Sequence, residues 1–135
     1  MLSNNEGLVI HLSLIALKSK HPRVREVALG YLFVLRSSPD APSDLTQRLL
    51  TLLEDPDVKI RVRTAVYLTE EGRPKIYQAL LDGVNDARSD VLLLAANHVA
   101  KLRGAGRIDP LRSTEDEINE AIEGHRKWLE KKLKP

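Results

Sequence analysis

The chain of 135 residues contains no cysteine, few aromatic residues and little net charge. The absence of cysteine excludes a disulfide framework and thiolate chemistry and favours a reducing compartment, so we expect a cytoplasmic protein. Aromatic residues make up only 4% of the chain, and aliphatic side chains must therefore fill the core. The formal net charge is +2, from 21 basic and 19 acidic residues, which is weak support for a polyanionic partner.

Long hydrophobic runs and catalytic motifs are also missing. Apolar stretches such as VLLLAANHVA are too short and too polar to cross a bilayer, and the N-terminal MLSNNEG lacks the basic region of a secretory signal. The chain has no GxSxG, P-loop, dinucleotide-binding fingerprint or HExxH motif, and its four histidines lack metal-ligand spacing. We expect no membrane partner, no enzymatic activity, no cofactor and no metal.

The chain does contain a repeated pattern, in which a short polar turn joins two apolar segments. The three copies are LIALKSKHPRVREVALGYL, LLTLLEDPDVKIRVRTAVYL and ALLDGVNDARSDVLLLAANHV. Apolar residues recur at helical spacing within each segment, and abundant Leu and Ala favour helix over strand. With 42% hydrophobic and 30% charged residues, the composition is that of one folded all-α domain over residues 1–135.

The expected helices form three pairs and one final helix. They are 6–18 with 23–36, 44–54 with 57–70, 74–84 with 88–103, and 114–133. Asp57 is a candidate N-cap of its helix, and either Ser43 or Asp44 can cap the helix before it. Thr114 with Glu117 three residues later is typical of a capping box, which predicts where the last helix begins.

This pattern resembles the HEAT-repeat family, including the HEAT-like repeats of phycobilin lyases. The resemblance rests on the Glu-Asp-Pro-Asp turn of the second repeat and on the pairs Val24-Arg25 and Val62-Arg63. In that family an Asp or Pro marks the turn within a repeat, and a Val-Arg pair opens its second helix. The resemblance covers about residues 8–103 and implies a short right-handed α-solenoid of about three helix pairs.

The two ends of such an array differ. The first helix is apolar nearly all round, with Leu8, Leu12 and Ile15 on one face. Either other segments of the chain shield that face, or it docks on a partner or on a second copy of the chain. The last helix has one apolar stripe, acidic residues at its start and basic residues at its end. We expect it to cap the third repeat, the alternative being a detachable helix that binds a partner groove or a membrane surface.

Basic residues cluster where the second helix of each repeat begins. The second repeat has an extra basic residue, so either Arg61 or Arg63 can align with Arg25. In the register that aligns Arg25 with Arg61, the two would form one row in a stack, whereas Leu92 stands at that position in the third repeat. Such a row can bridge to an Asp of a turn or of the next repeat. It can also form a basic edge that contacts a polyanion.

A second candidate row consists of Tyr31, Tyr67 and His98, with Asn97 beside the last. Second helices line the concave side of HEAT arrays, so this row is either a recognition surface or a set of core tyrosines with their hydroxyls at the rim. Asn97 lies in a very apolar helix and must be hydrogen-bonded if it is buried.

We therefore expect a non-catalytic scaffold that binds another protein, possibly a second copy of itself. Its contact sites would be the concave second-helix surface and the apolar first helix. The candidate contact residues are Tyr31, Tyr67, Asn97, His98, Arg25 and Arg61. The alternative is a nucleic-acid-binding protein that uses the basic edge. No residue supports a lyase of bilin attachment.

Overall fold

The computed structural model describes residues 2–135, and over these residues it confirms the prediction of an all-α protein. Seven α-helices and two 3-10 helices succeed one another without a strand in the described part of the chain. They are α1 (Leu2–Ala16), α2 (Pro22–Val34), α3 (Leu45–Leu50), η1 (Thr51–Glu54), α4 (Val58–Tyr67), η2 (Thr69–Glu71), α5 (Pro74–Val84), α6 (Ser89–Arg103) and α7 (Glu115–Leu133).

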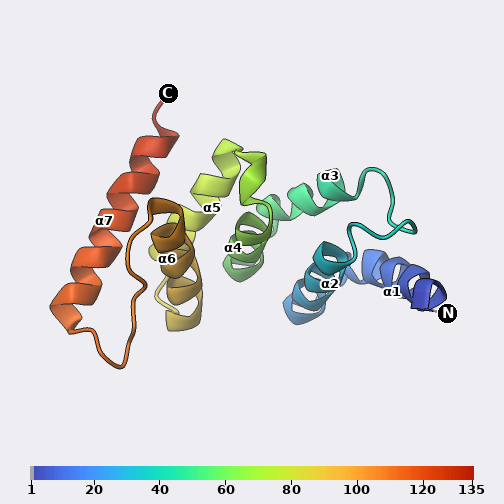
Figure 1. Cartoon of the computed structure of the whole chain (residues 1–135), viewed down its shortest axis with the longest axis horizontal. Helices are drawn as coiled ribbons and strands as arrows, with labels where there is room; N and C mark the ends of the chain where they lie inside the picture. The colour runs from blue at the N-terminus through green and yellow to red at the C-terminus, as the bar shows by residue number, and fades with distance from the viewer. Residues whose placement is uncertain (1) are drawn as a thin grey trace.

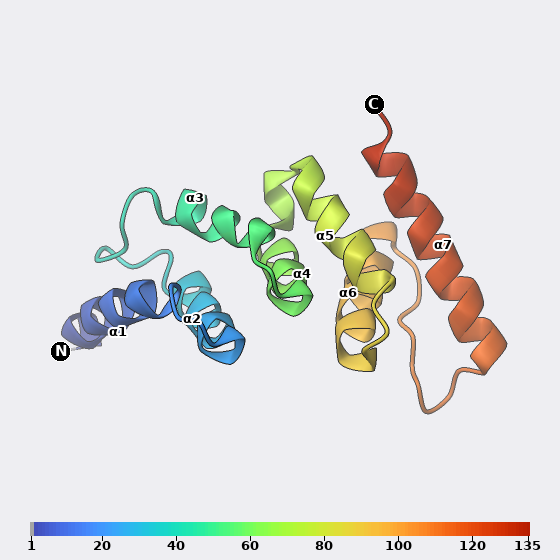
Figure 2. The ribbon, with the colours of Figure 1, turned by 180° about the vertical axis from the view of Figure 1, so that it is seen from behind.

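The helices are arranged along one long axis, with the two chain ends at opposite ends of the molecule (Figure 1). Helix α1 packs on α2, η1 packs on α4, and α5 packs on α6. Helix α2 also contacts α4, and α4 contacts α6, so the second helices of successive pairs lie side by side (Figure 2). Helix α7 packs against α5 and α6 and covers the C-terminal end of the helix stack.

Two helix starts, those of α4 and α7, have the side-chain caps that the sequence predicts. The carboxylate of Asp57 accepts a hydrogen bond from the Lys59 amide at 2.8 Å. The Thr114 hydroxyl accepts from the Glu117 amide, and the Glu117 carboxylate accepts from the Thr114 amide, so the capping box is confirmed. Asp44 stands at the N-cap position of α3, but its side chain bonds to Arg48 instead of capping the helix.

A continuous aliphatic core connects the helices. Its fully buried large side chains come from every α-helix from α2 to α7, and they include Leu29, Leu49, Ile60, Leu80 and Leu129. At about 1.5–3 kcal/mol for each fully buried aliphatic side chain, this core is the main source of stability. Leu, Ile, Val and Ala thus fill the core of this chain, which has few aromatic residues.

Helix α1 contributes only one side to this core. Ile10 is buried, whereas Leu8, Leu12 and Ile15 are 57%, 54% and 59% exposed. The expectation that other segments of the chain shield this face is therefore wrong for the described residues. It leaves an apolar surface at the N-terminal end of the array.

Candidate partner-binding groove

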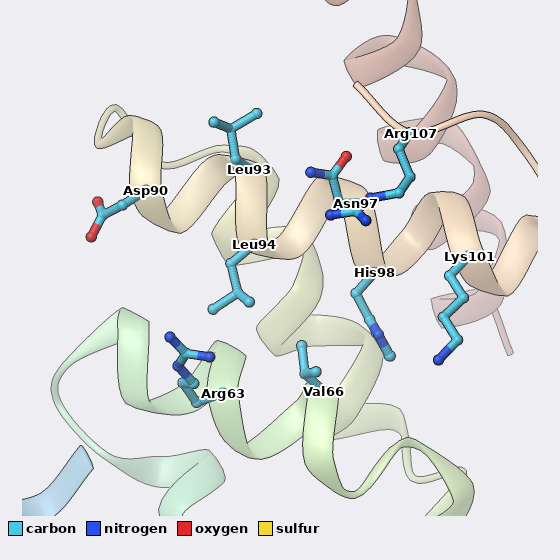
Figure 3. Close-up of a pocket in the computed structure, with 9 residues that line it drawn as sticks. All are labelled: Arg63, Val66, Asp90, Leu93, Leu94, Asn97, His98, Lys101 and Arg107. Atoms are coloured by element: carbon cyan, nitrogen blue, oxygen red, sulfur yellow. The ribbon is translucent and has the colours of Figure 1, made fainter. Parts of the chain in front are cut away.

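A groove of about 580 Å³ lies between α4 and α6. Figure 3 shows its lining, with Val66 rising from α4 toward the side chains of α6. Leu93 and Leu94 supply further apolar surface, and both are only half-buried. The remaining lining residues are polar or charged: Arg63, Asp90, Asn97, His98, Lys101 and Arg107.

The groove side of α6 follows from the spacing of its residues. Positions 90, 93, 94, 97, 98 and 101 lie on one helical face, because they recur at intervals of three and four residues. On the opposite face Val91, Ala95 and Val99 are completely buried in the core. The helix therefore presents a mixed apolar and polar stripe to the groove while it remains anchored by small aliphatic residues.

His98 is held in one tautomer by the helix turn opposite it. The Thr69 hydroxyl donates its single hydrogen to the Ala65 carbonyl at 2.6 Å, so it must accept the hydrogen of His98 Nε2, which lies 2.6 Å away. The neutral ring then has an unprotonated Nδ1 that can accept a hydrogen bond. Burial, together with the nearby charge of Lys101, lowers the pKa of His98 below its usual value, which keeps the ring neutral at pH 7.

Asn97 ties the loop between α6 and α7 to the groove. Its Oδ1 accepts a hydrogen bond from the Ile108 amide at 3.0 Å, and the Ile108 side chain is buried in the core. This contact satisfies the requirement that a half-buried Asn be paired. The same hydrogen bond holds the loop segment that carries Arg107. The Arg107 side chain extends over the groove face of α6, close to Asn97 (Figure 3).

Ion pairs join three helices at the opposite end of the groove. Lys59 lies 3.2 Å from the carboxylate of Asp90 on α6 and 3.7 Å from that of Glu26 on α2. Arg63 Nε lies 3.3 Å from the same Glu26 carboxylate. Glu26 also pairs with Arg23 of α2 at 3.1 Å, so two acidic and three basic side chains are linked where α2, α4 and α6 meet.

The structure does not bring the predicted row of Tyr31, Tyr67 and His98 into one surface. The Tyr67 ring stacks on Phe33 of α2, with ring centroids 4.4 Å apart, and it does not line the groove. Tyr31 is 54% exposed and lines a separate hollow between α1 and α2 together with Leu12. Of this row and its neighbour Asn97, only Asn97 and His98 share the groove.

Arg25 and Arg61 form equivalent contacts in successive helix pairs. Arg25 donates to the carbonyl oxygen of Ser19 and to the carboxylate of Asp55, which precedes the next second helix. Arg61 donates to the carbonyl oxygen of Asp55, also six residues earlier, and lies 3.6 Å from the carboxylate of Asp82. Both side chains therefore bridge neighbouring helix pairs, as the first interpretation of the arginine row expects.

Several groove residues were absent from the sequence prediction. The three-and-four spacing along α6 could have identified Leu93, Leu94 and Lys101, because they flank the predicted Asn97 and His98 on the same face. Arg107 lies in an irregular loop and has no periodic pattern that places it.

The described residues 2–135 contain no cluster of three or more His, Asp or Glu side chains that could hold a metal ion. None of the helices described there is long and apolar enough to span a membrane. Comparison with models of protein families found no match, and searches of curated proteins and of solved structures found none either.

Proposed function

We propose that this chain is a short HEAT-like α-solenoid that binds a segment of another protein in the groove between α4 and α6 and carries out no catalysis. The observation that carries the proposal is the half-buried apolar stripe of Val66, Leu93 and Leu94, which lies between polar groups held in place. Specific recognition surfaces combine apolar contact area with a few oriented hydrogen-bonding groups. Here His98 and Asn97 are the oriented groups.

The repeat architecture has support in the contacts of the second helices. Helix α2 contacts α4, and α4 contacts α6, as successive repeats of a solenoid do. The bonds of Arg25 and Arg61 to a carbonyl oxygen six residues earlier recur in consecutive pairs. Surfaces formed by such stacked second helices are suited to extended partners, because each repeat adds contact area along one direction.

The groove is tested by comparing two surface leucines. Leu94→Lys places a charge on the groove stripe, whereas Leu111→Lys changes a side chain that is 94% exposed outside it. In affinity capture from the native cell, proteins retained by the unaltered chain and by Leu111→Lys should be lost with Leu94→Lys. An identical set of proteins from all three baits would contradict the proposal. Melting curves of both variants establish that they are folded.

A second contact site is the apolar surface of α1 and α2, where Leu12 lines a hollow with Val27 and Tyr31. Leu8 and Ile15 of α1 are exposed as well. Exposed apolar groups of this kind favour association, including association with a second copy of the chain. Sedimentation at micromolar concentration should then show a species larger than the monomer, and Leu12→Lys should remove it. A monomer for the unaltered chain would exclude self-association at this site.

Nucleic-acid binding, the alternative suggested by the arginine row, has less support. Arg25, Arg61 and Arg63 contact the carboxylates of Asp55, Asp82 and Glu26 respectively, so much of their field is cancelled. A basic nucleic-acid site requires affinity that falls steeply with salt through counterion release. Absence of binding to duplex and single-stranded DNA at low salt would eliminate this alternative.

A further inference from the structure

Charge is distributed unevenly along the groove between α4 and α6. At the start of α6, Lys59 and Arg63 are paired with Glu26 and Asp90 through three ion pairs, and Glu26 also pairs with Arg23. A partner gains little from adding a charge there, because every charged group already has a counterpart. Because its charged side chains are already paired, this end sets no strong requirement on the charge of a partner.

The other end of the groove carries two cations without such counterparts. Lys101 and Arg107 are exposed, and neither forms an ion pair with any described residue of the chain. Asp109 and Glu70, acidic residues of the adjoining loop and of η2, pair instead with Arg112 and Arg36.

His98 does not change this balance. Its ring lies between the apolar stripe and Lys101, and it is neutral at pH 7 because burial and the Lys101 charge lower its pKa. Neutral His98 presents Nδ1 as an acceptor, since Nε2 donates to Thr69. The end of the groove thus has a net positive charge.

The apolar stripe and the cationic end lie within reach of one short peptide. Leu94 and Lys101 are seven residues apart on α6, which corresponds to about 10 Å along the helix axis. An extended peptide advances about 3.3 Å per residue, so about three residues cover this distance. One segment can then place an aliphatic side chain on Leu94 and a carboxylate near Lys101.

We propose that the groove binds an acidic-aliphatic protein segment, in which Leu, Ile or Val packs on Val66 and Leu94 and an Asp or Glu about three residues away meets Lys101 and Arg107. The inference rests on the proposed function and adds the chemistry of the partner. It is carried by charge complementarity: the cations at one end of an apolar groove have no carboxylate of their own. The segment should therefore lie with its aliphatic side chain at Leu94 and its acidic residues at the Lys101 end of the groove.

A displayed library of random 12-residue peptides tests the inference on the full-length chain. Enriched peptides should contain Asp or Glu two to four residues from Leu, Ile or Val more often than the starting library does. Fluorescein-labelled versions of these peptides should bind Lys101→Ala/Arg107→Ala about tenfold more weakly, because two charged contacts are lost. The matched control Lys131→Ala/Lys134→Ala removes two exposed charges at the C-terminal end of α7, one in the helix and one just after it, and should bind like the unaltered chain.

Charge exchange provides a second readout. The original acidic probes are compared with probes in which Lys replaces each acidic residue. The variant Lys101→Glu/Arg107→Glu should bind the Lys-containing probes more tightly than the acidic ones. Both substituted side chains are exposed, and an unchanged melting temperature checks that the fold is retained. Acidic probes that bind this variant as tightly as the unaltered chain would overturn the inference.

Other outcomes separate the inference from the proposed function. The selected peptides could lack an acidic bias and yet lose binding with Leu94→Lys, or with Leu93→Lys if the first variant does not fold. That result would overturn the inference and leave the proposed function standing. Peptides unaffected by either groove variant would overturn both. A labelled single-stranded oligonucleotide that binds through Lys101 and Arg107, with no peptide bound there, would overturn both in favour of nucleic acid.

Discussion

The guanidinium of Arg25 and the carboxylate of Asp55 form a buried two-point contact between successive helix pairs. Nε lies 2.8 Å from Oδ2, and Nη2 lies 3.0 Å from Oδ1. Asp55 Oδ1 also accepts from the Asp57 amide, and Arg25 Nη1 donates to the Ser19 carbonyl oxygen. The joint between α2 and the turn before α4 is thus a polar contact within an aliphatic core.

Arg25→Met should destabilise the protein by about 3 kcal/mol, because it leaves the buried Asp55 carboxylate without its cation. Urea unfolding measures the change. The matched control is Arg48→Met, whose exposed pair with Asp44 contributes less than about 1 kcal/mol. If both substitutions lower the free energy of unfolding by the same amount, burial does not make the Arg25–Asp55 pair more important for stability than an exposed pair.

Two helical glycines should respond in opposite directions to the same substitution. A Cβ at Gly83 would lie 2.6 Å from Ala95 Cβ and 2.7 Å from a methyl carbon of Val62, so Gly83→Ala should destabilise by about 1–2 kcal/mol despite better helix propensity. At Gly30 the nearest neighbour is the Tyr67 hydroxyl at 3.8 Å, and Gly30→Ala should stabilise by about 1 kcal/mol. Thermal unfolding of both variants tests this contrast.

Deleting residues 114–135 should lower the melting temperature, since α7 covers α5 and buries Leu129 completely. Leu129→Ala should by itself cost about 2–4 kcal/mol, whereas Thr114→Ala should cost about 1 kcal/mol through loss of the capping box. An unchanged melting temperature after the deletion would favour the alternative of a detachable helix.

Stability should fall as the medium becomes acidic, in part because of His125. Arg103 can only donate, so His125 Nδ1 is the acceptor at 3.1 Å, and burial followed by the Arg103 charge lowers the pKa of the ring. Folded and unfolded chains are both neutral at this residue above about pH 6.5. Below that pH the unfolded chain binds the proton first, so the stability is progressively lost as pH falls toward the folded pKa.

His125→Gln should therefore flatten the dependence of the unfolding free energy on pH below about pH 6.5. Each histidine can contribute at most about 1.4 kcal/mol per pH unit to that dependence. The exposed His11 provides the control, because His11→Gln leaves the buried ring in place. A slope in His125→Gln equal to that of the unaltered chain would contradict the assignment.

The helices could be predicted because their apolar spacing and caps are local properties. Helix α5 has the predicted bounds 74–84, and the Thr114 capping box marks the start of α7. The predicted helices 44–54 and 57–70 were less accurate, because each ends in a 3-10 segment. At the second of these, the Thr69 hydroxyl bonds to the Ala65 carbonyl and to His98, a contact between helices that no local pattern contains.

The site was harder to predict because it depends on how neighbouring helices pack. Aligned positions in successive repeats are expected to face one surface, yet Tyr67 stacks on Phe33 while Tyr31 faces a different hollow. Asn97 was predicted because a polar residue in an apolar helix requires a partner, and His98 because it aligns with the two tyrosines. Arg107 could not be predicted, since its loop segment is positioned by the hydrogen bond from Ile108 to Asn97 and by burial of the Ile108 side chain, both contacts between distant parts of the chain.

That same hydrogen bond gives the groove an internal spectroscopic reporter. The Ile108 amide is the donor to Asn97 Oδ1, and the Ile108 side chain is buried while its loop neighbours are exposed. In an NMR spectrum of the ¹⁵N-labelled protein, one resonance therefore reports both whether the loop is docked and whether a partner occupies the groove.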